Sequence, residues 1–163
     1  MLVTKTGLLR GKQHVLDFNR YKGELRYAPE APSSSVVTLD IESASVVCRD
    51  TWVSEKDRRK IQAFAVTDML DAQNHPRITF RSTAVKPSGA DQYTVAGTLT
   101  IRGTSKPVFV NVKLRATGVL TFEGRAVVKL SDYGLKPPTA ALGTIGTKDE
   151  MTLVFLVTAK PAS

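Results

Sequence analysis

The sequence is poor in the residues that hold small domains together by covalent or metal links. Among 163 residues it has a single cysteine, Cys48, which excludes an intrachain disulfide and a cysteine-rich zinc site. Its only histidines, His14 and His75, are too few for most zinc sites, whose ligand sets are larger. We therefore expect no metal and no cofactor. A chain of this length can instead fold around a hydrophobic core of its own.

Long apolar runs are also absent. No stretch of about 18 apolar residues occurs, so no transmembrane segment is predicted. Near the start, Lys5, Arg10 and Lys12 interrupt the apolar residues that a secretory signal would need. We expect a cytoplasmic protein from the chain as it stands, and a periplasmic one if Met1 was added to a processed product.

Aromatic residues make up only 7% of the chain, although its net charge is strongly positive, +8 at pH 7. A basic surface favours anionic partners. Nucleic acids without duplex structure, however, bind where aromatic side chains stand among basic ones on one strand face. Here the aromatics lie mostly on the apolar side of each strand pattern, and the densest basic cluster, residues 56–60 (KDRRK), begins a helix. We therefore expect no nucleic-acid partner.

What the sequence does have is alternation of apolar and polar residues with a period of two, which is typical of strands with one buried face. The clearest case is residues 97–114 (GTLTIRGTSKPVFVNVKL), in which two alternating runs flank a break that contains Gly103 and Pro107. This pattern predicts a β-hairpin. Similar runs, about seven or eight in all, cover most of the chain and are mostly joined by short connections.

One segment departs from this period and predicts the only helix. Ser54 followed by Asp57 resembles a capping box, and Phe64 and Met69 belong to an apolar stripe at helical spacing. The His-Pro dipeptide at 75–76 is expected to stop this helix. One helix inserted among hairpins, with no internal repeat or linker, predicts a single domain over residues 1–163. Its class is mainly β, an antiparallel barrel or sandwich.

A barrel of about eight strands has an interior that side chains can fill or that can hold one small ligand. Alternation of apolar and polar residues predicts the inner faces of the strands in both cases. It therefore leaves open whether the apolar faces of this chain meet only one another or enclose an apolar guest.

Three motifs follow one another along the chain. A proline followed by I-T-F-x-S stands at residues 76–82, the stretch G-x-L-T-I-x-G-x-[TS]-K-P at residues 97–107, and D-[FY]-G at residues 132–134. In this order they resemble the signature of the YceI-like family, whose members are associated with binding polyisoprenoids and other long-chain lipids. The resemblance implies an eight-stranded antiparallel lipocalin-like β-barrel with one inserted helix and an apolar channel for an extended lipid tail.

Apolar residues at alternating strand positions, together with two residues of the helix, are the candidates for the wall of such a channel. They are Phe18, Leu39, Ile41, Phe64, Met69, Ile78, Phe80, Val95, Leu99, Ile101, Val110, Val112, Phe122, Val128, Leu153 and Phe155. Gly97 and Gly124 interrupt these faces without a side chain, which is expected to leave room for a guest. For each residue the alternative is ordinary core packing.

Basic residues near strand ends are the candidates for contact with a polar head group: His14, Arg20 and Arg125. Each of them is alternatively a solvated surface residue. Turn chemistry alone explains Lys106, which precedes a proline. Asp132 of the D-Y-G motif is expected to accept hydrogen bonds from backbone N–H groups at the start of a loop.

The leading hypothesis is a non-enzymatic binding or carrier module that sequesters a polyisoprenoid, an isoprenoid quinone or a fatty acid derivative in the barrel interior. One alternative is a stress-response or interaction module with a filled barrel and no ligand. A less favoured one is a lipid-processing enzyme that uses Cys48 or a histidine, because no G-x-S-x-G, P-loop or dinucleotide fingerprint is present. A homodimer is a further possibility.

Overall fold

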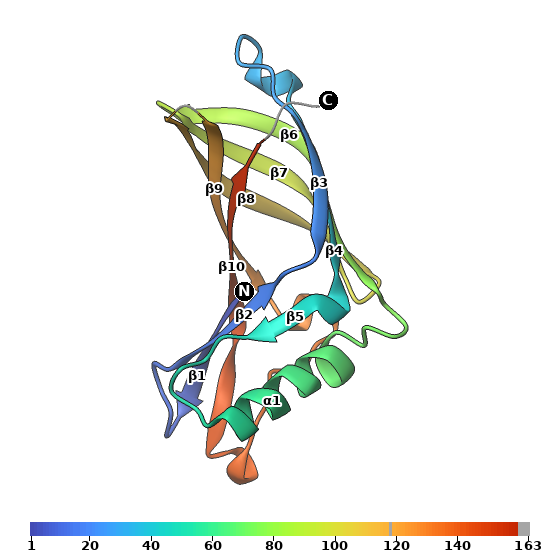
Figure 1. Cartoon of the computed structure of the whole chain (residues 1–163), viewed down its shortest axis with the longest axis vertical. Helices are drawn as coiled ribbons and strands as arrows, with labels where there is room; N and C mark the ends of the chain where they lie inside the picture. Colours follow the sequence, from blue (N-terminus) through green and yellow to red (C-terminus); the bar gives the residue numbers. More distant parts are fainter. Residues whose placement is uncertain (118, 160–163) are drawn as a thin grey trace.

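The structure, a computed structural model, describes residues 1–117 and 119–159 (Figure 1). Its strands are β1 (Leu2–Gly7), β2 (Gln13–Phe18), β3 (Tyr21–Arg26), β4 (Val36–Glu42), β5 (Val46–Cys48), β6 (Arg77–Gly89), β7 (Gln92–Ile101), β8 (Thr104–Thr117), β9 (Val119–Lys129) and β10 (Ile145–Thr158). The helix α1 (Glu55–Phe64) continues into a π-helical turn, η3 (Ala65–Met69). Four short 3₁₀ turns are η1 (Pro32–Ser34), η2 (Ser43–Ser45), η4 (Ser131–Tyr133) and η5 (Ala141–Gly143).

All these strands belong to one curled antiparallel sheet in the order β3-β4-β6-β7-β8-β9-β10-β1-β2-β5. The mainly β class, the antiparallel arrangement and the inserted helix are therefore confirmed. The sheet has ten strands rather than eight. The difference arises from elements such as β5, whose three residues are too few to show a period of two.

The sheet has two sections that differ in what covers them (Figure 1). In the upper section, β3, β4, β6 to β9 and residues 153–158 of β10 curl around an interior space. In the lower section, β1, β2, β5 and residues 145–152 of β10 form the wall, and α1 packs across it. Both sections share one continuous hydrophobic core.

The hairpin between β7 and β8 is confirmed, and its turn is tighter than the predicted break. Only Arg102 and Gly103 lie between the strands, with φ angles of 49° and 74°. Two consecutive left-handed residues form the turn type that matches the twist of paired strands. Arg102 Nη1 also donates a hydrogen bond to the backbone oxygen of Asp68 at 3.2 Å, which ties this turn to η3.

The start of α1 is as expected, but its end is not. Ser54 Oγ accepts a hydrogen bond from the backbone N–H of Asp57 at 3.1 Å and donates one to its carboxylate at 2.8 Å. The helix ends at Met69, before the His-Pro dipeptide that was expected to stop it. Asp71 has a φ of 46°, and the left-handed backbone at this residue turns the chain out of the helix.

Candidate functional site

The curled sheet encloses a cavity of about 1200 Å³ that extends through both sections. Every predicted channel residue except Val128 lines it. Period-two alternation therefore located the cavity wall on most strands. That these side chains contact a ligand stays a prediction.

Val128 is the exception. It is 7% exposed, belongs to the hydrophobic core and lies opposite Met151, which does line the cavity. Ala126 on β9 and Leu130, the residue after β9, lie two positions to either side of Val128 and also line the cavity. The structure thus places Val128 in the hydrophobic core without contact with the cavity.

The two glycines expected to leave room for a guest do not. A Cβ atom on Gly97 would lie 2.5 Å from the ring of Phe80, and one on Gly124 would lie 1.9 Å from the ring of Phe155. Phe155 is directly opposite Gly124 in the β9–β10 pair. The aromatic rings therefore occupy the space above the glycines, an arrangement known from designed sheets. At these two positions the cavity wall is therefore aromatic, and the glycines add no space for a ligand.

At the upper end of the cavity, three aromatic residues form a cluster that the sequence did not reveal. The hydroxyl oxygens of Tyr27 and Tyr93 are 3.1 Å apart and share a hydrogen bond, and both residues line the cavity with Phe122. The ring of Tyr27 packs edge-on against Phe122, with centroids 5.7 Å apart. This hydrogen bond is the first cause of the raised pKa of Tyr27, about 12, with burial second. The cluster supplies hydroxyl groups in an otherwise apolar region.

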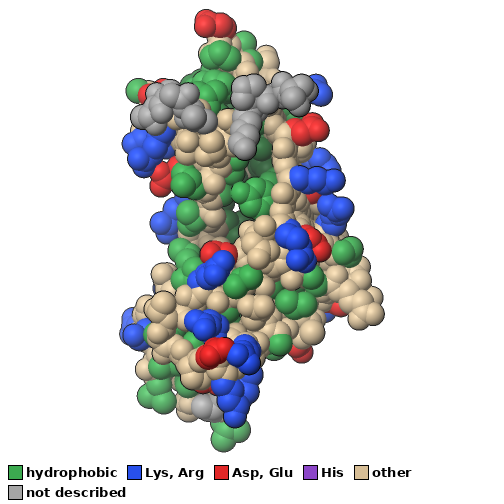
Figure 2. All heavy atoms as spheres, viewed as in Figure 1, with side chains coloured by type: hydrophobic (Ala, Val, Ile, Leu, Met, Phe, Trp, Pro, Cys, Tyr) green, Lys and Arg blue, Asp and Glu red, His purple; other side chains and the backbone are tan. Residues whose placement is uncertain are grey.

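The upper section is open along one side. Consecutive residues of β3, from Tyr21 to Leu25, and of β10, from Leu153 to Thr158, line the cavity. Because side chains of a strand alternate between two faces, consecutive lining residues mean that the cavity meets these strands along their edges. Hydrophobic side chains are visible in the hollow between the two edges (Figure 2). Among the described residues, β3 pairs with β4 alone. The cavity thus opens sideways between β3 and β10.

In the lower section, His14 forms a buried polar pair with Asp50. His14 Nδ1 lies 2.5 Å from Asp50 Oδ2, and since a carboxylate accepts, the imidazole N–H donates. Asp50 Oδ1 accepts the backbone N–H of Val15 at 2.7 Å. The Asp50 side chain is fully buried, and the ring of Trp52 lies 5.2 Å from that of His14. His14 lines the cavity, as does Lys5, a residue that sequence reasoning missed.

The other two head-group candidates lie outside the cavity. Arg20 forms two hydrogen bonds with the carboxylate of Glu42 on the surface, at 2.5 and 2.9 Å. This pairing raises the pKa of Arg20 and lowers that of Glu42. Arg125 is exposed on the outer face of β9, opposite Asn111 of β8. Neither arginine lines the cavity, so neither is placed to contact a head group inside it.

Two further expectations concern side chains near the loops. Asp149, not Asp132, binds the start of the loop after β9, accepting hydrogen bonds from the backbone N–H and the hydroxyl of Ser131 at 2.8 and 2.6 Å. These bonds lower the pKa of Asp149. Cys48 is 3% exposed, and burial raises the pKa of its thiol, which makes the reactive thiolate scarce.

Within the described ranges, no three His, Cys, Asp or Glu side chains are grouped so that they could hold a metal ion. In the same part of the chain, no helix is both long and apolar enough to cross a membrane.

A curled antiparallel sheet around one large apolar cavity, closed below by a helix and open along one side, defines a barrel-like module with an internal cavity. The chain belongs to the YceI-like family, because the model of the YceI-like domain matches residues 4–159. The resemblance inferred from the motifs is thereby confirmed.

The chain is also similar in sequence to UPF0312 proteins. A UPF0312 protein of Pseudomonas aeruginosa is 34% identical over 126 residues, which are 73% of this chain and 62% of that protein. A UPF0312 protein of Pectobacterium carotovorum is 31% identical over 143 residues, 83% of this chain and 69% of that protein. The match to the Pseudomonas relative thus covers less than two thirds of that relative's length.

Solved structures show the same fold. BcnA of Burkholderia cenocepacia superimposes with a TM-score of 0.74 at 24% identity, covering 98% of this chain and 96% of that chain. A mutant YCEI protein of Campylobacter jejuni, solved with a monobromobimane guest, gives a TM-score of 0.72 at 20% identity over 91% of this chain and 85% of that chain.

Proposed function

We propose that the protein is a binding or carrier module that holds one long-chain apolar molecule in its cavity, with no catalytic step. The observation that carries this proposal is the cavity of about 1200 Å³ with an almost continuous apolar wall. Burial of about ten methylene groups supplies ~8 kcal/mol, the free energy of a micromolar complex before the costs of association. A chain-like ligand can reach this affinity without directional contacts.

The size of the cavity favours this function over a filled barrel. Protein interiors are normally close-packed, and apolar voids reduce stability in proportion to their volume. Phe80 and Phe155 fill the gaps above two glycines, so the sequence closes small voids in the wall while the large one persists. This contrast supports a cavity that is kept for a guest.

The ligand classes that fit are a polyisoprenoid, an isoprenoid quinone or a fatty acid derivative. All three bring a long apolar tail with one polar end. The cavity offers matching surroundings: apolar walls along its length, hydroxyls of Tyr27 and Tyr93 at the upper end, and the His14–Asp50 pair in the lower section.

Native mass spectrometry of the purified protein, followed by organic extraction, tests the proposal. We expect a stoichiometric adduct that is released by solvent, or one that forms on incubation with a polyprenol, a quinone or a fatty acid. A mass that stays that of the bare chain after all three incubations would contradict a binding function. Cys48→Ala is expected to bind as the wild type does, whereas lost binding would revive a role for the thiol.

A further inference from the structure

Lys5 is a buried cation in the wall of an apolar cavity. It lies on β1 two residues after Val3, and both residues are buried and line the cavity. Between them, Thr4 faces outward, where its hydroxyl accepts a hydrogen bond from Gln13 at 3.2 Å on the surface. The backbone N–H of Lys5 donates to the oxygen of Lys12 at 2.8 Å, which fixes the strand. The Lys5 side chain, only 8% exposed, is thus held on the inner face.

Among the described residues, the ammonium group of Lys5 makes no hydrogen bond and no ion pair. The negative charge that acts on it is that of Asp50, which partly offsets the lowering of the Lys5 pKa by burial. Both Asp50 oxygens are already bonded, to Val15 and to His14. Lysine is rarely this buried unless it is paired. Its Nζ atom keeps some accessible surface, because the Tyr133 hydroxyl is the only side-chain polar atom of the described residues that is both fully buried and without a hydrogen-bond partner. The ammonium group is therefore free to take an acceptor in the cavity that Lys5 lines.

The surroundings define the charge that this acceptor can carry. The carboxylate of Asp50 is already bonded to the backbone N–H of Val15 and to the imidazole of His14. Among the described residues, Lys5 therefore contributes one positive charge that no side chain pairs directly, and one further negative charge can pair with it. A phosphate or diphosphate group would bring more negative charge close to Asp50, where little water screens the repulsion. A single carboxylate matches the one positive charge of Lys5, and it accepts strong hydrogen bonds from an ammonium group.

We propose that Lys5 Nζ binds the carboxylate of a long-chain fatty acid, whose acyl tail runs up the cavity toward the opening between β3 and β10. This inference rests on the proposed lipid-binding function and narrows its ligand to long-chain carboxylic acids. The acyl tail would follow the apolar wall from Val3 and Met151 in the lower section to Phe155 and Phe122 in the upper one. Binding is then oriented, with the polar end deep and the methyl end near the opening.

The test compares dodecanoate with dodecanol, which share a tail and differ in the head group. Each displaces the uncharged fluorescent dye N-phenyl-1-naphthylamine from the wild type, from Lys5→Met and from the matched surface control Lys12→Met. Lys12 is exposed and does not line the cavity, so its variant removes the same charge elsewhere. Lys5→Gln repeats the comparison with a polar side chain if Lys5→Met does not fold, as judged by circular dichroism.

We expect the wild type and Lys12→Met to bind dodecanoate about tenfold or more tightly than dodecanol. Lys5→Met should lose this preference while its affinity for dodecanol changes by less than about twofold. A folded Lys5 variant that keeps the preference for dodecanoate would overturn the role of Lys5, and so would a wild type without any preference. If the dye, the acid and the alcohol all fail to bind, the proposed binding function itself is wrong.

Discussion

The upper and lower sections of the sheet treat polar groups differently. In the upper section, the hydroxyls of Tyr27 and Tyr93 inside the cavity are neutral and bonded to each other, and the charged residues that line it, Lys22 and Glu24 on the edge of β3, are exposed. In the lower section, charged groups are buried, with Asp50 fully covered and Lys5 8% exposed. Neutral bonded groups suit a region that an apolar tail passes, because burying them costs little. Buried charge is costly and is therefore expected where it has a use.

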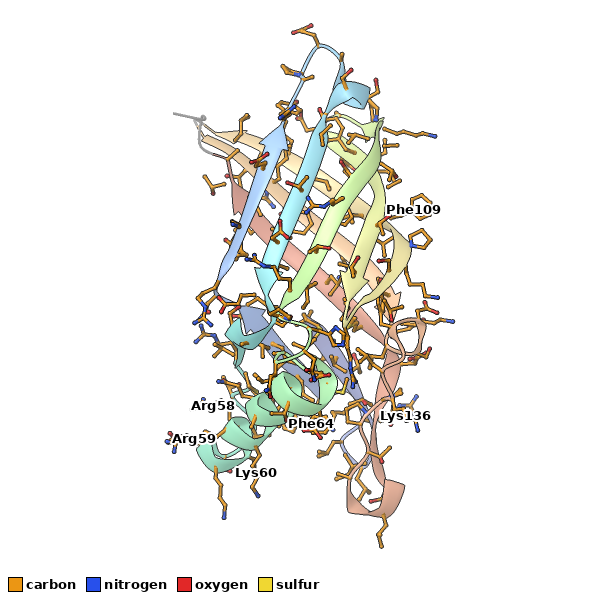
Figure 3. The ribbon with its side chains drawn as sticks, turned by 90° about the vertical axis from the view of Figure 1, so that its right-hand side faces the viewer. Arg58, Arg59, Lys60, Phe64, Phe109 and Lys136 are labelled. Carbon is orange, nitrogen blue, oxygen red and sulfur yellow. The ribbon has the colours of Figure 1, made fainter. Side chains whose placement is uncertain are left out.

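The two sections also differ in how they meet the solvent. Below, α1 lies across the wall, and Arg59 projects from it away from the sheet (Figure 3). Above, the edges of β3 and β10 border the opening, and Tyr21 and Leu156 on these edges are 56% and 65% exposed. Exposed apolar side chains at an opening into an apolar cavity are typical of a ligand-binding groove. This difference supports the proposed orientation of the ligand, with entry through the side opening of the upper section and the polar end in the lower section.

The largest effect is expected from filling the space that the two sections share. Ala126→Trp places an indole in the cavity, since Ala126 lines it and is 6% exposed. If the ring displaces about three methylene groups of a ligand, the loss is ~2.4 kcal/mol, or about 50-fold in affinity. Val127→Trp is the matched control, because Val127 is 57% exposed on the outer face. Dye titration of both variants measures the difference, and equal affinities would place the ligand outside the cavity.

The next effect concerns the aromatic wall of the upper section. Gly124→Ala puts a Cβ atom where the ring of Phe155 now lies, so the ring must move. We expect a loss of about 1–3 kcal/mol in the free energy of unfolding, as for other overpacked sites. In Gly89→Ala the new Cβ atom meets side-chain atoms of Gln92 at an ordinary 3.7 Å. Urea denaturation of both variants checks the prediction, which fails if they lose the same stability.

A smaller change of opposite sign is expected in the lower section. Lys5→Met removes an unpaired, partly desolvated charge and keeps a chain of similar length, so the ligand-free protein should gain less than about 1 kcal/mol at neutral pH. Because burial lowers the pKa of Lys5 below 10.5, the unfolded chain holds the proton more tightly than the folded one. The wild type should therefore recover part of this difference as the pH rises toward 10.5. Urea denaturation of both proteins from neutral to alkaline pH measures it, and a pH-independent difference would contradict it.

The sequence predicted the cavity wall well, because a period of two assigns each residue of a strand to one face. It could not predict what fills the space above Gly97 and Gly124. That depends on register, since Phe155 reaches Gly124 only because β9 and β10 pair at those residues. A single strand carries no information about its partner's alignment. The side opening was unpredictable for the same reason, because it requires knowing that β3 is an edge.

The polar residues of the lower section were the harder part. Lys5 occurs in a strand of six residues, and the usual exposure of lysine argues for the surface. The signal that could have located it is its position two residues after Val3, on the same face of the strand. Arg20 and Arg125 were proposed for head-group contact because they carry a charge near a strand end. That position does not tell which face of the strand a side chain occupies.

The smallest expected change in stability concerns Tyr133, a buried residue for which, unlike Lys5, no role in ligand binding is proposed. Tyr133 in η4 is 2% exposed, and its hydroxyl is the only buried side-chain polar atom in the described residues that has no hydrogen-bond partner. Unlike Lys5, it does not line the cavity. Tyr133→Phe should therefore leave ligand affinity unchanged and raise the free energy of unfolding by up to about 1 kcal/mol at neutral pH.

Alkaline titration sharpens this last comparison. Burial raises the pKa of Tyr133 from 10.0 to about 12, so above pH 10 the unfolded chain releases this proton first. The wild type should then lose stability as the pH rises from 10 toward 12, and Tyr133→Phe should lose less. Lys5 shifts stability in the opposite direction, upward as the pH approaches 10.5. Urea denaturation of Tyr133→Phe, Lys5→Met and the double variant separates the two groups, and parallel pH curves for the wild type and Tyr133→Phe would show that the hydroxyl is solvated.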